Sequence, residues 1–149
     1  MAMKLFKTIF SFEGNSPSVC DIPLGGSYDD FYDVVSCVQD KHTGDFRLDL
    51  CLDEYGVFVD VSIDEDECIS EIEVSFYPYS PFDYNEMRKI YSSLMDIFDY
   101  TRKIEHTDET FIDDELEYEY SLELMNESYK LTVKKDSYNQ KVNVTLSSL

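Results

Sequence analysis

Apolar and polar residues alternate along much of this chain, which is the pattern of β-strands with one buried and one exposed face. The clearest example runs from Leu116 to Met125, where leucine and tyrosine alternate with glutamate and serine. Acidic turns at residues 53–56 and 64–67 separate neighbouring stretches, so we expect an antiparallel meander. The predicted strands are residues 3–12, 46–53, 57–64, 71–76, 116–125, 129–135 and 141–146.

Two other stretches carry apolar residues every three or four positions, the spacing of one face of an α-helix. The first begins at Ser27, with Asp30 in the capping-box position. The second begins at Ser80, and its apolar stripe covers residues 87–101. The sequence therefore predicts one α+β domain over residues 1–149, an antiparallel sheet of about seven strands with two helices on one face.

The order of these elements repeats, because a capped helix followed by three strands occurs in each half of the chain. The segment Arg47–Val59 aligns with Ser121–Val133, and the acidic turn of one falls on the acidic turn of the other. This predicts a duplicated unit, residues 27–77 and 80–146, behind an N-terminal strand. The alternative is that two amphipathic hairpins with acidic turns align without a common origin.

The composition is that of a folded domain with a strongly acidic surface. At 149 residues, with 43% hydrophobic and 15% aromatic content, the chain can bury a core without metals or disulfides. Its formal net charge of -20 disfavours direct binding to nucleic acid or to an anionic membrane surface. A basic protein partner, divalent cations or solubility alone remain as explanations for the charge.

The cellular compartment is indicated by the cysteines and by the N-terminal segment. The four cysteines lack C-x-x-C spacing, so we interpret them as free thiols in a reducing compartment. Lys4 and Lys7 interrupt the apolar N-terminal stretch, and no apolar run approaches the roughly 20 residues that span a bilayer. We therefore expect a cytoplasmic protein that has no membrane partner.

Carboxylates are concentrated in two windows that contain no lysine or arginine. The first acidic window, residues 48–87, has twelve of the 32 acidic residues, and the second acidic window, residues 104–129, has ten. Solubility alone does not require such segregation. Alternate residues lie roughly 6.6 Å apart along a strand, and neighbouring strands lie about 4.8 Å apart. Acidic strands therefore approach the charge density of a nucleic-acid backbone, which has one phosphate per roughly 3.4 Å on each strand.

We interpret the acidic strands as a face that occupies the place of phosphates on a basic protein, such as a nuclease, a toxin or another nucleic-acid-binding protein. On this hypothesis the protein is a small inhibitor or immunity-type protein that acts by nucleic-acid mimicry. Tyr77 and Tyr79 are the expected interface aromatics. The candidate partner-binding residues are Asp49, Asp53, Asp60, Asp64, Asp66, Glu71, Glu73, Tyr77, Tyr79, Asp113, Asp114, Glu117, Glu119 and Glu123.

Two other functions are compatible with the sequence: an acidic protein-interaction or assembly domain without mimicry, and a weak divalent-cation-binding protein. A calcium loop over Asp60–Glu71 lacks the glycine required at its sixth position, where Glu65 stands. No enzyme is expected, because the chain has two histidines and no nucleophile-elbow, P-loop, dinucleotide or metalloprotease motif. We predict no catalytic residue, metal ligand or cofactor, and the oligomeric state stays open.

Overall fold

The computed structural model describes residues 10–12, 17–19, 22–30, 38–39, 46–52, 55–78, 84–136 and 141–149. Its strands are β1 (Phe10–Ser11), β2 (Ser18–Val19), β3 (Ile22–Pro23), β4 (Val38–Gln39), β5 (Phe46–Leu52), β6 (Tyr55–Ile63), β7 (Ile69–Pro78), β8 (Arg102–Ile112), β9 (Glu115–Met125), β10 (Tyr129–Asp136) and β11 (Lys141–Ser148). The long helix is α3 (Tyr84–Ile97), and residues 28–30 form a helical turn.

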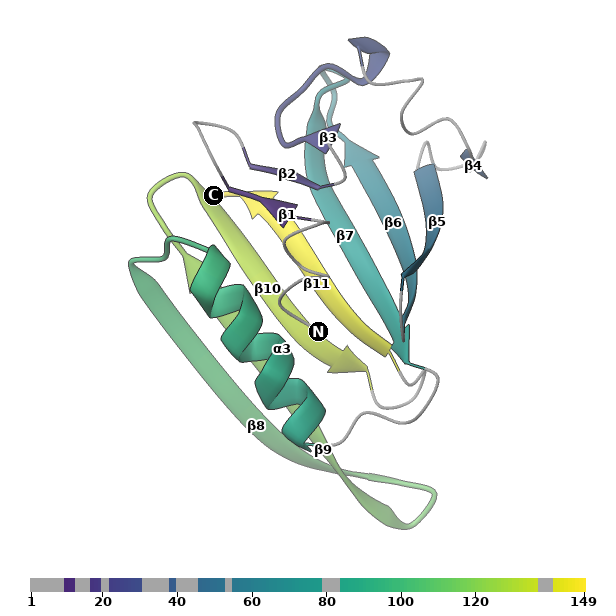
Figure 1. Ribbon diagram of the computed structural model, residues 1–149, viewed down its shortest axis with the longest axis vertical. Helices are drawn as coiled ribbons and strands as arrows, with labels where there is room; N and C mark the ends of the chain where they lie inside the picture. The colour runs from purple at the N-terminus through teal and green to yellow at the C-terminus, as the bar shows by residue number, and fades with distance from the viewer. Residues whose placement is uncertain are drawn as a thin grey trace.

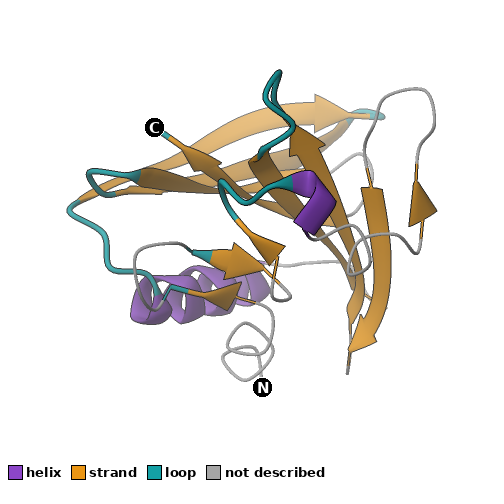
Figure 2. Ribbon diagram, turned by 90° about the horizontal axis from the view of Figure 1, so that it is seen from above, coloured by secondary structure: helices purple, strands orange, loops and turns teal. Residues whose placement is uncertain are grey.

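The main layer is an eight-stranded sheet in the order β4-β5-β6-β7-β11-β10-β9-β8, and all its described pairs are antiparallel. Strands β1, β2 and β3 form a separate small antiparallel sheet. Helix α3 and the small sheet lie on the same face of the main sheet, as Figures 1 and 2 show. The predicted antiparallel α+β architecture is therefore confirmed in its broad form.

The core lies between the main sheet and the two elements that cover its inner face. Alternate residues of β6, β7, β9, β10 and β11 are buried, as period-two patterning requires. Helix α3 supplies its apolar stripe, and the small sheet adds its own apolar side chains. The covering residues that are buried are Phe10, Val19, Ile22, Leu24, Ile90, Tyr91, Leu94 and Phe98.

Three local predictions need correction. No strand was predicted over residues 105–114, but this acidic segment is largely strand β8. Helix α3 ends at Ile97 rather than continuing to residue 101. Strand β8 forms because its backbone pairs with β9 from Arg102 to Ile112, and this tertiary pairing overrides a charged sequence with no apolar alternation. The end of the predicted first strand forms β1 of the small sheet, and residues 3–9 of that prediction lie outside the described residues. The helix predicted after Ser27 is described only over residues 28–30, and its continuation also lies outside the described residues.

The strand order is symmetric about its centre, where β7 pairs with β11. On each side of this pair the strands run outward in reverse chain order, from β7 to β4 and from β11 to β8. At the centre of this order, Val74 of β7 pairs with Val144 of β11. One continuous cross-strand row on the inner face is Leu48, Val59, Val74, Val144, Val133, Leu122.

Strands β8 and β9 extend past the rest of the sheet. They pair with each other from Arg102↔Met125 to Ile112↔Glu115, whereas β9 pairs with β10 only over residues 121–125. Residues 108–119, which we call the β8–β9 arm, therefore form a two-stranded hairpin that projects beyond β10. Figure 1 shows the arm at the lower end of the molecule.

Candidate acidic interface

One group of exposed carboxylates surrounds the turn between β6 and β7, and we call residues 64–67 with Glu71 the turn patch. The Asp64 carboxylate orders this turn, because its Oδ1 accepts hydrogen bonds from the backbone N–H of Asp66 at 2.9 Å and of Cys68 at 3.0 Å. The four side chains of residues 64–67 and that of Glu71 are exposed. The backbone N–H of Tyr28 donates to the Glu67 carbonyl at 2.8 Å, and this contact holds residues 28–30 beside the turn.

A second acidic group lies on the outer face of β6 and β7. Asp60 stands opposite Glu73 in the antiparallel register, and Ser62 stands opposite Glu71. Burial raises the pKa of the half-buried Glu73 carboxyl. The Lys141 ammonium lowers this pKa, Asp60 and Glu71 raise it, and a hydrogen bond with Ser75 lowers it. This group is therefore a crowded polar cluster and not a freely solvated row.

The outer face is not acidic across its whole width. The row that contains Asp60 and Glu73 continues through Thr145 and Thr132 before it reaches Glu123 on β9. The adjoining positions of the central strands carry the lysines 130, 134 and 141. Because Lys130 Nζ lies 3.9 Å from Glu123 Oε1, that carboxylate already has a cationic neighbour.

The third acidic group is the β8–β9 arm. Its turn is formed by Asp113 and Asp114, whose φ angles of 52° and 65° give the two left-handed residues of a type I′ hairpin. Both side chains are exposed, as are those of Asp108 and Glu109. Phe111 stands beside them with 76% of its surface exposed, although it is a large apolar residue. The arm therefore presents carboxylates around one exposed aromatic ring.

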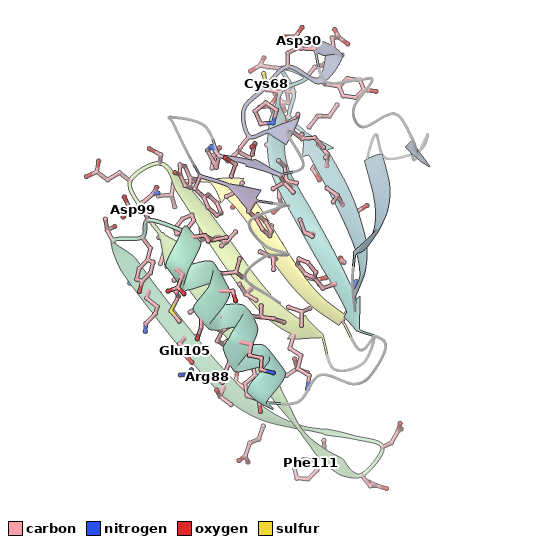
Figure 3. The ribbon with its side chains drawn as sticks, in the orientation of Figure 1. Asp30, Cys68, Arg88, Asp99, Glu105 and Phe111 are labelled. Atoms are coloured by element: carbon pink, nitrogen blue, oxygen red, sulfur yellow. The ribbon has the colours of Figure 1, made fainter. Side chains whose placement is uncertain are left out.

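The structure places the predicted residues in separate regions. Figure 3 shows Asp30 and Cys68 of the turn region at one end of the long axis and Phe111 of the arm at the other. Asp64, Asp66 and Glu71 belong to the turn patch; Asp60 and Glu73 belong to the outer face of β6 and β7; Asp113, Asp114 and Glu119 belong to the arm; and Glu123 lies on the sheet beside Lys130.

The remaining predicted residues are described by their backbone or fall outside the described ranges. Asp49 pairs with Phe58, Tyr77 with Gly56, and Glu117 with Thr110. Asp53 and Tyr79 lie outside the described residues. Phe111 was not among the residues predicted from the sequence. The signal for it was the Asp113-Asp114 turn, which has the apolar residues Phe111 and Ile112 directly before it and Leu116 shortly after it, as a hairpin would.

The polar side chains of α3, β8 and β10 include the buried Tyr91 and Lys135. The hydroxyl of Tyr91 has no hydrogen-bond partner among the described residues, and burial raises its pKa. Lys135 of β10 is buried, and its Nζ lies 5.6 Å from the centroid of the Tyr120 ring, within range of a cation–π contact. Arg88 Nη1 of α3 lies 2.6 Å from Glu105 Oε1 of β8, which ties the helix to the edge strand.

No known protein family, curated protein or solved structure matches this chain. Within the described ranges, histidine, cysteine and carboxylate side chains form no group of three that could hold a metal ion. None of the described helices has the length and apolarity needed to cross a membrane. The features of the described surface that could bind a partner are the three acidic groups and the exposed aromatic ring.

Proposed function

We propose that this protein binds a basic protein partner through exposed carboxylates and thereby covers the partner's nucleic-acid-binding surface. The observation that carries the proposal is the exposure of the turn patch and of the arm in regions with no lysine or arginine. The exposed acids in these regions have no ion-pair partner among the described residues. A partner that brings cations to these carboxylates would gain electrostatic energy without breaking an existing pair.

Retaining such uncompensated charge has a cost for the free protein, because like charges repel and weaken the compact state. A net charge of -20 also produces a long-range field that accelerates encounter with a cationic surface. A groove that binds phosphates would respond to the same field, which favours an inhibitor or immunity-type role. Steric exclusion by a rigid sheet would then complete the block.

The symmetric strand order of the main sheet is compatible with an origin by duplication. We infer that residues 27–77 and 80–146 arose from one helix-plus-strands unit, because the symmetric row from Leu48 to Leu122 joins equivalent positions of the two halves. The sequence alignment of Arg47–Val59 with Ser121–Val133 supports the same inference, since both hairpins have the same register. Such a duplication supplies two acidic ends, one from each half, on one domain.

Affinity capture with two charge variants and a matched control tests this function. The purified protein is immobilised, retained proteins are eluted with a gradient to about 0.5 M NaCl, and each is assayed for displacement of fluorescent duplex DNA. One variant neutralises the arm (Asp108→Asn, Glu109→Gln, Asp113→Asn), and another neutralises the turn patch (Glu65→Gln, Asp66→Asn, Glu71→Gln). The control neutralises three exposed acids elsewhere (Asp96→Asn, Asp99→Asn, Glu127→Gln).

We expect a basic, DNA-binding protein to be retained, to lose DNA when the complex forms, and to elute with salt. At least one of the two patch variants should bind it about tenfold more weakly than the control variant, since all three change the net charge equally. Equal binding by all three variants would show that only the overall field matters and would refute the assignment of an interface. Retention that survives high salt would favour the assembly-domain alternative, for which the exposed Phe111 is the specific observation.

A further inference from the structure

The edge strand β8 has backbone groups available for pairing. Strand β8 ends the order of the main sheet, and among the described strands it pairs with β9 alone. It is 11 residues long, whereas β4 at the opposite edge has two. Proteins normally shorten or cover such edges, because a long edge strand is a template for another strand. The length of β8 is therefore unusual for an edge with no other role.

The side chains of β8 select the kind of strand that can pair with it. Glu105 and Glu109 occupy inner-face positions, opposite Leu122 and Tyr118, while Asp108 occupies an outer-face position. All three side chains belong to exposed residues. Glu105 is already paired with Arg88 of α3, whereas Glu109 and Asp108 have no ion-pair partner among the described residues. An added strand that is neutral or acidic would place its side chains beside these two unneutralised carboxylates. A cationic strand would find opposite charges on both faces.

A second copy of the chain is a poor occupant of this edge. In the antiparallel self-pairing centred on Thr107, Glu105 of each copy stands opposite Glu109 of the other, and like charges directly opposite are destabilising. Each copy also has a net charge of -20. In that register His106 of each copy stands opposite Asp108 of the other.

Phe111 provides an apolar anchor on the same strand. It occupies an inner-face position, in phase with Glu105 and Glu109, and lies on the arm beyond the sheet. An aromatic side chain that is 76% exposed can still lose most of its contact with water when a partner covers it. Residues 105–111 of β8 thus combine a backbone edge that none of the described strands pairs with, acidic side chains and one aromatic ring.

We propose that the free edge of β8 receives an extended, cationic segment of a partner protein as an added β-strand, with Phe111 as its apolar anchor. This proposal rests on the proposed function, because it specifies how a basic partner is held. Backbone hydrogen bonds supply affinity in strand addition, and side-chain charge supplies selectivity. The arm and β8 are then the binding element, and the turn patch at the other end contributes long-range attraction.

A capped eight-residue peptide made of two Lys-Lys-Val-Val repeats is the probe, because it places both lysine and valine on each face of the added strand. Its control has the same sequence with every backbone nitrogen methylated, which keeps the charge and removes the N–H donors. Binding is measured by calorimetry at low salt, and amide hydrogen exchange is followed by NMR with each peptide. Phe111→Ser tests the anchor, and Leu149→Ser is its matched control, since Leu149 is also a large apolar residue and is 66% exposed.

We expect the unmethylated peptide to bind and to slow exchange at alternate amides of Arg102–Ile112 by about tenfold or more. The methylated peptide should bind about tenfold more weakly, and Phe111→Ser should weaken binding about tenfold while Leu149→Ser leaves it unchanged. Equal binding of both peptides, or protection confined to other strands, would overturn strand addition and leave the proposed function standing. A free protein that sediments as a dimer with β8 protected would also overturn it, because the edge would already be occupied. If a basic partner is captured and the peptide does not bind, this inference fails alone; if neither binds, both fail.

Discussion

Replacing Tyr91 with phenylalanine should stabilise the protein, although most substitutions of buried residues are destabilising. The Tyr91 side chain is 2% exposed and lies in α3, which packs on the inner face of the sheet. Its hydroxyl is the buried side-chain polar atom without a hydrogen-bond partner among the described residues. Phenylalanine keeps the ring and removes that atom, so the apolar contacts of the helix are retained.

The size of the effect follows from the cost of burying a hydroxyl without a partner. That cost is about 1–3 kcal/mol in protein mutational series. Because phenylalanine leaves a small gap where the oxygen stood, we expect a net gain of about 1 kcal/mol. For a domain of this size the gain corresponds to a rise of roughly 2–4 °C in the melting temperature.

The pH dependence gives a second measure of the same burial. Burial raises the pKa of the Tyr91 hydroxyl in the folded protein, and the Glu105 carboxylate and Tyr120 raise it further while Arg88 lowers it. The unfolded chain ionises tyrosine near about pH 10. The folded state therefore loses stability as the pH rises above that value, because only the unfolded chain can release this proton. The phenylalanine variant should lose less stability than the wild type over the same alkaline range.

Urea unfolding followed by circular dichroism at neutral and alkaline pH measures both effects. Tyr91→Leu is the control for ring packing and should be destabilised by about 2 kcal/mol or more, since it removes buried aromatic surface. A loss of stability in Tyr91→Phe at neutral pH would show that the Tyr91 hydroxyl has a favourable partner in the folded state, and that its burial therefore does not destabilise the protein.

Three further substitutions test other parts of the fold. Asp114→Gly should stabilise the protein by up to about 1 kcal/mol in thermal unfolding, because glycine adopts the left-handed φ of the type I′ turn without strain. Glu73→Gln should stabilise the protein at neutral pH, because burial raises the pKa of Glu73 and disfavours its charged form in the folded state. The gain should vanish as the pH falls below the ordinary glutamate pKa of 4.5, where the carboxyl is neutral in both the folded and the unfolded chain. Arg88→Gln should cost less than about 1 kcal/mol in urea unfolding at low salt and still less at high salt, because both members of its ion pair with Glu105 are partly exposed.

Much of the sheet could be predicted because alternation in the sequence reports burial directly. The inner-face residues Val59, Val74 and Val144 were expected on strands, and all three are buried. The hairpin of β9 and β10 was also expected, since Leu122 and Leu124 alternate with polar residues up to the turn at residue 126. In these segments local patterning and tertiary packing favour the same structure.

The remaining features depended on information that is not local. Strand β8 has too many charged residues to alternate, and it forms because β9 is alongside it. Alternation also assigns a residue to a face but does not give the order of the strands. That order places β11 and β10, with their lysines, between Glu73 of β7 and Glu123 of β9. The two acids therefore lie on the same face of the sheet but are not adjacent. The exposure of Phe111 follows from the same order, because among the described strands none continues beside the arm.

If exposed carboxylates of this protein hold a basic partner, the dissociation constant of the complex must depend on the salt concentration. The constant for the captured partner should be measured by calorimetry from about 0.05 to 0.5 M NaCl, for the wild type and for the variant with a neutralised arm. We expect the affinity to fall at least about tenfold over this range and the variant to have a shallower slope on a log–log plot. An affinity that stays constant across the range, or identical slopes for the two proteins, would mean that the carboxylates of the arm do not hold the partner.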